Sequence, residues 1–193
     1  MRLAAPCSSV VSRYTLRMRL EHFAALLLAV PLGCATPRPA PVEPTPVGSL
    51  ASLQSCGALF MGGQPSEADL EALAARGVRR VINLRKDGEF KDYDERARAE
   101  SLGLEYVVLQ FSTPEELTDA VLGRSRELLK QSGERGTLLH CGSGNRVGAL
   151  WLAHRTLDEG VAWEEALREA QAVGLKNPAY TERIRAYVES ARR

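Results

Sequence analysis

A short stretch late in the chain carries residue types suited to nucleophilic chemistry. Its sequence is His140-Cys141-Gly142-Ser143-Gly144-Asn145-Arg146, and it follows the apolar run Thr137–Leu139. A thiolate is a strong nucleophile, and the two glycines allow a tight turn whose N–H groups point inward as an anion cradle. A helix that begins directly after the turn adds the positive end of its dipole at the same point.

The arginine of this stretch completes a site for an oxyanion. A guanidinium presents fixed donors that hold two oxygens of a tetrahedral anion. We therefore expect Cys141 to attack phosphorus, Arg146 to hold the phosphoryl oxygens, and water to hydrolyse the phosphocysteine intermediate. The expected phosphate-binding residues are Gly142, Ser143, Gly144, Asn145 and Arg146. The plainer alternative, a structural cysteine beside a surface arginine, explains less because strand, cysteine, glycines, arginine and helix occur in order.

The two histidines of the later chain have different interpretations. His140 either positions the thiolate or is a satisfied histidine at a strand end, and both interpretations stay open. His154 lies inside the next expected helix and is expected to be structural. These two histidines are fourteen residues apart without a cysteine pair, so the sequence predicts no metal site, and it implies no cofactor.

The elements that must position these residues alternate along the chain. Apolar periodicity, β-branched runs, capping residues and glycines mark their ends. The expected strands are residues 78–84, 104–111 and 137–140, and the expected helices are residues 66–76, 92–102, 113–130, 144–157, 163–172 and 177–191. Helices between strands imply crossover connections, so we expect an α/β fold with a central, mainly parallel sheet flanked by helices.

The Cys141 stretch resembles the signature of cysteine-dependent protein tyrosine and dual-specificity phosphatases. A second stretch agrees, because Gly62–Leu70 followed by Gly77–Arg85 is similar to the start of the bacterial phosphatase-like domain of beta-lactamase-hydrolase-like proteins. The resemblance covers residues 57–190. It implies a tyrosine-phosphatase-like fold and a cysteine-dependent phosphatase acting on phosphomonoesters, phosphotyrosine among them.

Two features depart from that signature. Most tyrosine phosphatases place five residues between the cysteine and the arginine, and here there are four, a spacing that also occurs in the phosphatase-like bacterial domains and in rhodaneses. The arginine is usually followed by Ser or Thr, whose hydroxyl stabilises the departing thiolate, and here Val147 takes that place. We expect slower breakdown of the intermediate, unless Ser143 substitutes for the missing hydroxyl.

The resemblance also implies a general acid, which is usually an Asp on the loop after the strand that ends here at Phe111. The segment 110–116 holds no Asp, so Glu115 is the acid assigned here, with Glu116 and Asp87 as alternatives. Each has a competing structural interpretation, at a helix start for the glutamates and in a turn for Asp87. Without a good acid, aryl phosphates are the favoured substrates because their leaving groups need little protonation.

Two other functions fit part of the pattern. A rhodanese-like sulfurtransferase has the same four-residue spacing, but the Gly-His-Ile-like segment usual before its loop has no counterpart between residues 51 and 139. A catalytically silent phosphate-binding module would explain both the missing acid and Val147. The phosphatase remains the favoured function.

The first fifty residues differ from the rest. Basic residues, the short apolar run Phe23–Val30 and the small residues around Cys34 predict a signal peptide over 1–33 of lipoprotein type, with lipid on Cys34. Ordinary cleavage after Ala35 is the alternative. A Pro-rich tether over 34–50, which we expect to join no helix or sheet, would lead to the phosphatase-like domain over 51–193. We thus expect a lipid-anchored protein on the periplasmic side of the cell envelope, or a secreted periplasmic one.

Charge and cysteine content narrow the partners. Residues 1–33 hold four of the 25 basic and one of the 24 acidic side chains, so the remainder has a net charge of −2. That balance gives no case for nucleic acid, and it leaves a phosphorylated protein or small molecule as partner, with membrane contact only through the anchor and no indication of oligomeric state. Cys56 is either a small packed residue or a reversible disulfide partner of Cys141.

Overall fold

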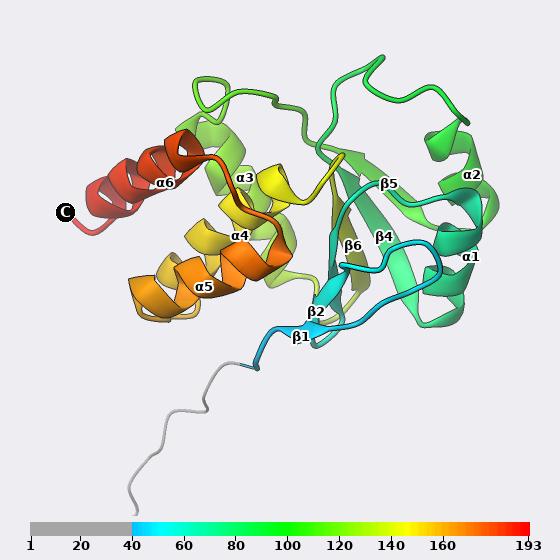
Figure 1. Cartoon of the computed structure of the whole chain (residues 1–193), viewed down its shortest axis with the longest axis horizontal. Helices are drawn as coiled ribbons and strands as arrows, with labels where there is room; N and C mark the ends of the chain where they lie inside the picture. The colour runs from blue at the N-terminus through cyan, green and yellow to red at the C-terminus, as the bar shows by residue number, and fades with distance from the viewer. Residues whose placement is uncertain (1–39) are drawn as a thin grey trace, which may run out of the picture. The chain divides into compact units, whose positions relative to one another are not determined.

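The computed structural model describes residues 40–193 (Figure 1). The expected signal peptide over 1–33, its lipidation site Cys34 and the first part of the tether lie outside the described residues. Within the described part, no helix is long and apolar enough to cross a membrane.

A six-stranded sheet forms the centre of the body, in the order β1-β2-β3-β6-β4-β5. The β3–β6, β6–β4 and β4–β5 pairs are parallel, and the β1–β2 and β2–β3 pairs are antiparallel. The strands are β1 (Glu43–Pro44), β2 (Gln54–Cys56), β3 (Leu59–Gly62), β4 (Val78–Asn83), β5 (Glu105–Val108) and β6 (Gly136–His140). The expected mainly parallel sheet is confirmed.

Helices cover both faces of the sheet, as Figure 1 shows, with α1 and α2 on one side and the other four on the opposite side. Their bounds are α1 (Glu67–Ala75), α2 (Glu95–Ser101), α3 (Asp119–Lys130), α4 (Asn145–Leu157), α5 (Trp163–Val173) and α6 (Pro178–Ala191). The two apolar cores follow the strand alternation, since Leu138 packs on the α1–α2 side and Leu139 on the α4 side. The expected flanking helices are therefore confirmed, with α2 and β5 shorter than expected.

The start of α3 differs from the sequence prediction. We expected a helix from Thr113, but α3 begins at Asp119 with Thr118 as its N-cap. Residues 113–118 form a separate turn, in which the amide of Glu116 lies 3.4 Å from the Thr113 hydroxyl and the amide of Leu117 donates to the Pro114 carbonyl. Thr113 and Thr118 both suit a capping position, but the turn lies between them, so the helix begins after Thr118 and not after Thr113.

The expected tether also differs, because its second half lies in the sheet. Glu43 and Pro44 pair with Ser55 and Gln54, so the expectation that this stretch joins no sheet is wrong there. Pro44 is tolerated because β1 is an edge strand, where a missing N–H costs no ladder bond. Val47 and Leu50 are buried in the core on the α1–α2 side.

Candidate active site

Cys141 follows β6 at the carboxyl edge of the sheet, and the side chain is buried. Its Sγ accepts a hydrogen bond from the Gly144 amide at 3.2 Å. The segment after β3 holds the turn from one side, because the Cys141 amide donates to the Gly62 carbonyl and the Gln64 amide donates to the Gly142 carbonyl, both at 3.3 Å. The thiol therefore accepts a backbone N–H bond within a turn that β3 and Gln64 hold in place.

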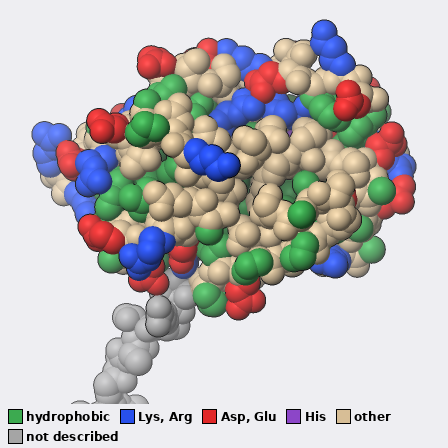
Figure 2. Space-filling model, viewed as in Figure 1, with side chains coloured by type: hydrophobic (Ala, Val, Ile, Leu, Met, Phe, Trp, Pro, Cys, Tyr) green, Lys and Arg blue, Asp and Glu red, His purple; other side chains and the backbone are tan. Residues whose placement is uncertain are grey.

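Gly144 is required by the shape of this turn. Its φ is +86°, and a Cβ placed on it would lie 2.3 Å from the Val173 carbonyl oxygen. The helix α4 begins at the next residue, so the first amides of the helix have no partners within it and are free to bind an anion. Basic side chains gather where the β6–α4 connection reaches the surface (Figure 2). The turn and the helix start thus have the arrangement that the sequence predicted for an anion cradle.

Arg146 is held in place by three acceptors from two other segments. Its Nη1 donates to the carbonyls of Leu84 (3.2 Å) and Phe111 (2.9 Å), which follow β4 and β5. Both Nη atoms bind the Glu89 carboxylate, at 2.9 and 2.6 Å. These contacts fix the plane of the guanidinium close to Cys141, with which it also interacts electrostatically.

Glu89 is a site residue that sequence reasoning missed. The Arg146 guanidinium, which donates two hydrogen bonds to Glu89, lowers the pKa of that carboxyl below its ordinary value. The carboxylate thus binds both Nη atoms of the guanidinium and balances its charge. The only local signal was an acidic residue after the turn at Gly88, which many surface turns share.

The remaining residues of the turn differ in their exposure and contacts. Gly142 and Ser143 are exposed at the surface of the turn, so their positions suit phosphate binding. The Asn145 side chain instead accepts hydrogen bonds from the amides of Lys176 (2.8 Å) and Asn177 (3.1 Å) and holds the α5–α6 connection. Val147 is fully buried and places no hydroxyl beside the thiol.

The acid candidates have different surroundings. Glu115 is exposed and lines a hollow with Pro178 and Arg183, and the Thr113 hydroxyl lowers the pKa of its carboxyl. Glu116 binds the Lys86 ammonium and the Ser112 amide, and the contact with Lys86 lowers its pKa to about 2. A general acid must hold a proton at working pH, and both shifts oppose that.

The third acid candidate, Asp87, accepts a hydrogen bond from the side-chain amide of Gln110 at 2.7 Å. A buried tyrosine also lies near Cys141 and Arg146. Tyr180 of α6 faces the charges of Cys141 and Arg146, burial raises the pKa of its phenol, and its hydroxyl donates to the Ser112 carbonyl at 2.9 Å. Tyr180 was not identified from the sequence because it lies far along the chain from the turn.

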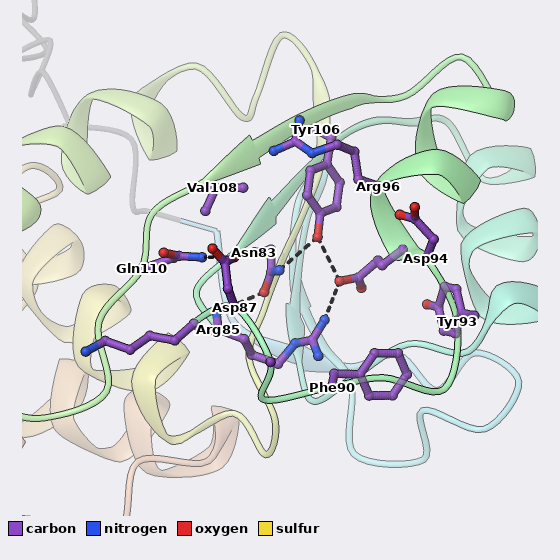
Figure 3. A pocket seen from close by; sticks show the side chains of 13 residues that line it. Asn83, Arg85, Asp87, Phe90, Tyr93, Asp94, Arg96, Tyr106, Val108 and Gln110 are labelled. Carbon is purple, nitrogen blue, oxygen red and sulfur yellow. Dashed lines mark hydrogen bonds and ion pairs between the residues drawn. The ribbon is translucent and has the colours of Figure 1, made fainter.

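A buried polar cluster lies directly behind the turn; we call it the Glu95 cluster. The Glu95 carboxylate accepts hydrogen bonds from Arg85 (2.5 Å), the Tyr106 hydroxyl (2.9 Å) and the Gln64 amide (3.1 Å). His140 joins it, with Nε2 3.2 Å from Glu95 Oε1 in a geometry that makes the contact electrostatic rather than a hydrogen bond. Asn83, Arg85 and Tyr106 also line a surface pocket, and Figure 3 shows their side chains pointing toward one another.

Cys56 lies too far from Cys141 for a disulfide. Cys56 pairs with Leu59, and Leu59 pairs with Thr137, four residues before Cys141. Four residues of strand span about 13 Å, well beyond the separation that a disulfide allows. Cys56 instead lies near Arg155, and its Sγ lies 3.4 Å from the Ala40 carbonyl oxygen, so this geometry does not support the disulfide alternative.

His154 lies among acidic side chains near the end of α4. His154 contacts Asp158 at 3.0 Å and Glu159 at 3.1 Å near the far end of α4, which fits its expected structural role. Across residues 40–193, no group of three His, Cys, Asp or Glu side chains is arranged to hold a metal ion.

Comparison with known proteins fits this geometry. No family model matches the chain. The beta-lactamase hydrolase-like protein of Agrobacterium fabrum is 30% identical over 104 residues, which are 52% of this chain and 24% of that protein. The chain thus spans about a quarter of the length of that relative.

Solved structures show the same fold. A DUF442 phosphatase from Shewanella putrefaciens superposes with a TM-score of 0.60 at 20% identity, over 73% of this chain and 91% of the other. TpbA of P. aeruginosa superposes with a TM-score of 0.60 at 24% identity, over 79% and 91%. The chain therefore has the fold of the cysteine-based tyrosine phosphatases, as the sequence predicted.

The buried histidine gives a testable dependence of stability on pH. Burial, partly opposed by Glu95, lowers the pKa of His140 from 6.5 to about 4. Between these values the unfolded chain binds more protons than the folded one, so stability is lost as the pH falls. We expect this residue to remove about 2 kcal/mol of unfolding free energy between pH 7 and pH 5.

Urea unfolding of wild type and His140→Asn at the two pH values measures this effect. The variant should lose less stability on acidification than the wild type by that amount. An equal loss in both proteins would show that His140 does not titrate in this way.

Proposed function

We propose that the protein is a phosphatase that hydrolyses phosphomonoesters, with Cys141 as nucleophile and Arg146 as the oxyanion clamp. One observation carries the proposal: a thiol that accepts a backbone N–H bond in a turn at the start of a buried helix, beside a guanidinium held by three acceptors. This arrangement stabilises a thiolate and binds a tetrahedral dianion at the same point.

The reaction has two displacements. The Cys141 sulfur forms a bond to phosphorus while the bond from phosphorus to the leaving oxygen breaks, and that oxygen takes a proton or leaves as an anion. Water then attacks phosphorus, the S–P bond breaks, and inorganic phosphate leaves as the thiolate is restored. Arg146 and the amides of residues 142–146 hold the equatorial oxygens in both steps, and Glu89 keeps the guanidinium in its plane.

The substrate class follows from the leaving group. TpbA, one of the structural relatives, has been crystallised with phosphotyrosine, which supports a phosphotyrosine-type substrate for this chain. The low pKa values of Glu115 and Glu116 favour the same conclusion, because a phenolate leaves with little help from an acid. We assign aryl phosphates as the preferred substrates over alkyl esters such as phosphoserine.

Replacing the nucleophile separates phosphate from sulfur chemistry. We expect wild type to release phosphate from para-nitrophenyl phosphate and Cys141→Ser to lose that activity, because a hydroxyl in this cradle is a far weaker nucleophile. Cys56→Ser is the matched control and should retain activity. Sulfur transfer from thiosulfate to cyanide without phosphate release would favour the rhodanese alternative, and neither activity would favour a binding module.

The lowered pKa values of Glu115 and Glu116 predict a steep dependence of the rate on the leaving group. Across substituted phenyl phosphates, kcat/KM should fall as the pKa of the phenol rises, and phosphoserine should be slower by about 10²–10⁴-fold. Glu115→Gln should leave this dependence unchanged. Similar rates for aryl and alkyl substrates would reveal an effective acid, and a loss of that rate in Glu115→Gln or Glu116→Gln would identify it.

We also propose that the chain is exported and anchored by lipid on Cys34, with its body on the periplasmic side. Support comes from the signal-like pattern before residue 34 alone. Mass spectrometry of the protein expressed from the full sequence in bacteria should find a mature amino terminus at acylated Cys34. An amino terminus at Thr36 would indicate a secreted protein, and an intact leader would contradict export.

A further inference from the structure

The charges of the Glu95 cluster are buried beside His140, the residue that precedes the nucleophile in the chain. The side chains of Arg85 and Glu95 are 6% and 4% exposed, and their closest N–O distance is 2.5 Å. Arg85 follows β4 and Glu95 is the first residue of α2, so the pair links two elements beside the Cys141 turn. Charges in a poorly solvated interior act over longer distances than surface charges, because water does not screen them.

His140 connects the Arg85–Glu95 pair to Cys141. His140 lies 3.2 Å from Glu95 and is followed directly by Cys141. The ring of His140 is fully buried, and in the structure neither of its nitrogens has a hydrogen-bond partner. The ring contacts Glu95 and also interacts with the backbone of Cys141, which links the buried pair to the nucleophile.

Other charged or titratable groups near His140 and Cys141 come from α4, from the segment after β4 and from α6. Arg146 faces His140 and Cys141 from α4, and Glu89 faces Arg146 from the segment after β4. Tyr180 faces Cys141 from α6. Burial raises the pKa of Tyr180 and Arg146 is always charged, so neither changes its protonation near neutral pH.

We propose that Arg85 and Glu95 are positioning residues that set the pH at which Cys141 becomes reactive, through the balance of two buried charges behind its turn. Neither residue touches the reacting sulfur. The inference rests on Cys141 being the nucleophile of the proposed phosphatase. It requires that removing either charge alone shifts the reactivity of Cys141, and that the two shifts have opposite signs.

The test is the pH dependence of Cys141 alkylation by iodoacetamide, followed at the Cys141 peptide by mass spectrometry. In Glu95→Gln the positive charge of Arg85 is uncompensated and favours the thiolate, so the midpoint should fall by about half to one pH unit. In Arg85→Gln the negative charge of Glu95 is uncompensated, so the midpoint should rise by a similar amount. The double variant is neutral, and its midpoint should return close to that of wild type.

Two controls accompany these variants. Glu105→Gln removes the partner of another buried arginine, Arg80, at the opposite end of β4, and should leave the midpoint unchanged. The Cys56 peptide of each sample should keep its own midpoint. Thermal unfolding identifies the variants that fold.

Several results would overturn the proposal. Shifts of the same sign in both single variants, or no shift in either, would show a merely structural pair. If the double variant folds and neither single variant does, the pair is merely structural and the proposal is wrong. Alkylation does not need catalysis, so opposite shifts without phosphate release would overturn the proposed function and leave this inference intact.

Discussion

A cysteine that acts as a nucleophile must carry negative charge at the end of a buried strand, and this constraint organises the surrounding structure. Burying an unpaired charge costs several kcal/mol, so the charge must be met by donors already in place. The free amides at the start of α4 and the guanidinium of Arg146 provide them. Because Arg146 is itself charged, it needs Glu89 and two backbone carbonyls to hold it where a phosphate would bind.

The same requirement explains the polar groups behind the turn. One carboxylate, that of Glu95, accepts bonds from side chains that follow β3 and β4 and from a tyrosine of β5, and it also contacts the last residue of β6. Four neighbouring strands are thereby joined at a single buried group. A partner lost from such a network leaves a buried charge or donor unpaired, so the geometry of the site and the stability of the body depend on the same contacts.

The sequence was sufficient for the features that local pattern determines. The order of strand, cysteine, glycines and helix placed Cys141 and Arg146 correctly in the fold, and the capping box at Ser66 marked the start of α1. Contacts across the sheet were not predictable in this way. Glu89 lies 57 residues from Arg146 and Glu95 lies 45 residues before His140, and only the order of the strands brings them together. The start of α3 was wrong because two threonines offered equivalent caps, and β1 was missed because an edge strand tolerates proline.

The central claim is that Cys141 carries the phosphoryl group during turnover. The direct measurement is rapid acid quenching of the enzyme during turnover of an aryl phosphate, followed by mass spectrometry of the Cys141 peptide. We expect one phosphoryl group on Cys141, which accumulates readily because buried Val147 offers no hydroxyl to the departing thiolate. Phosphate release with an unmodified Cys141 at every quench time, or a phosphoryl group on another residue, would contradict it.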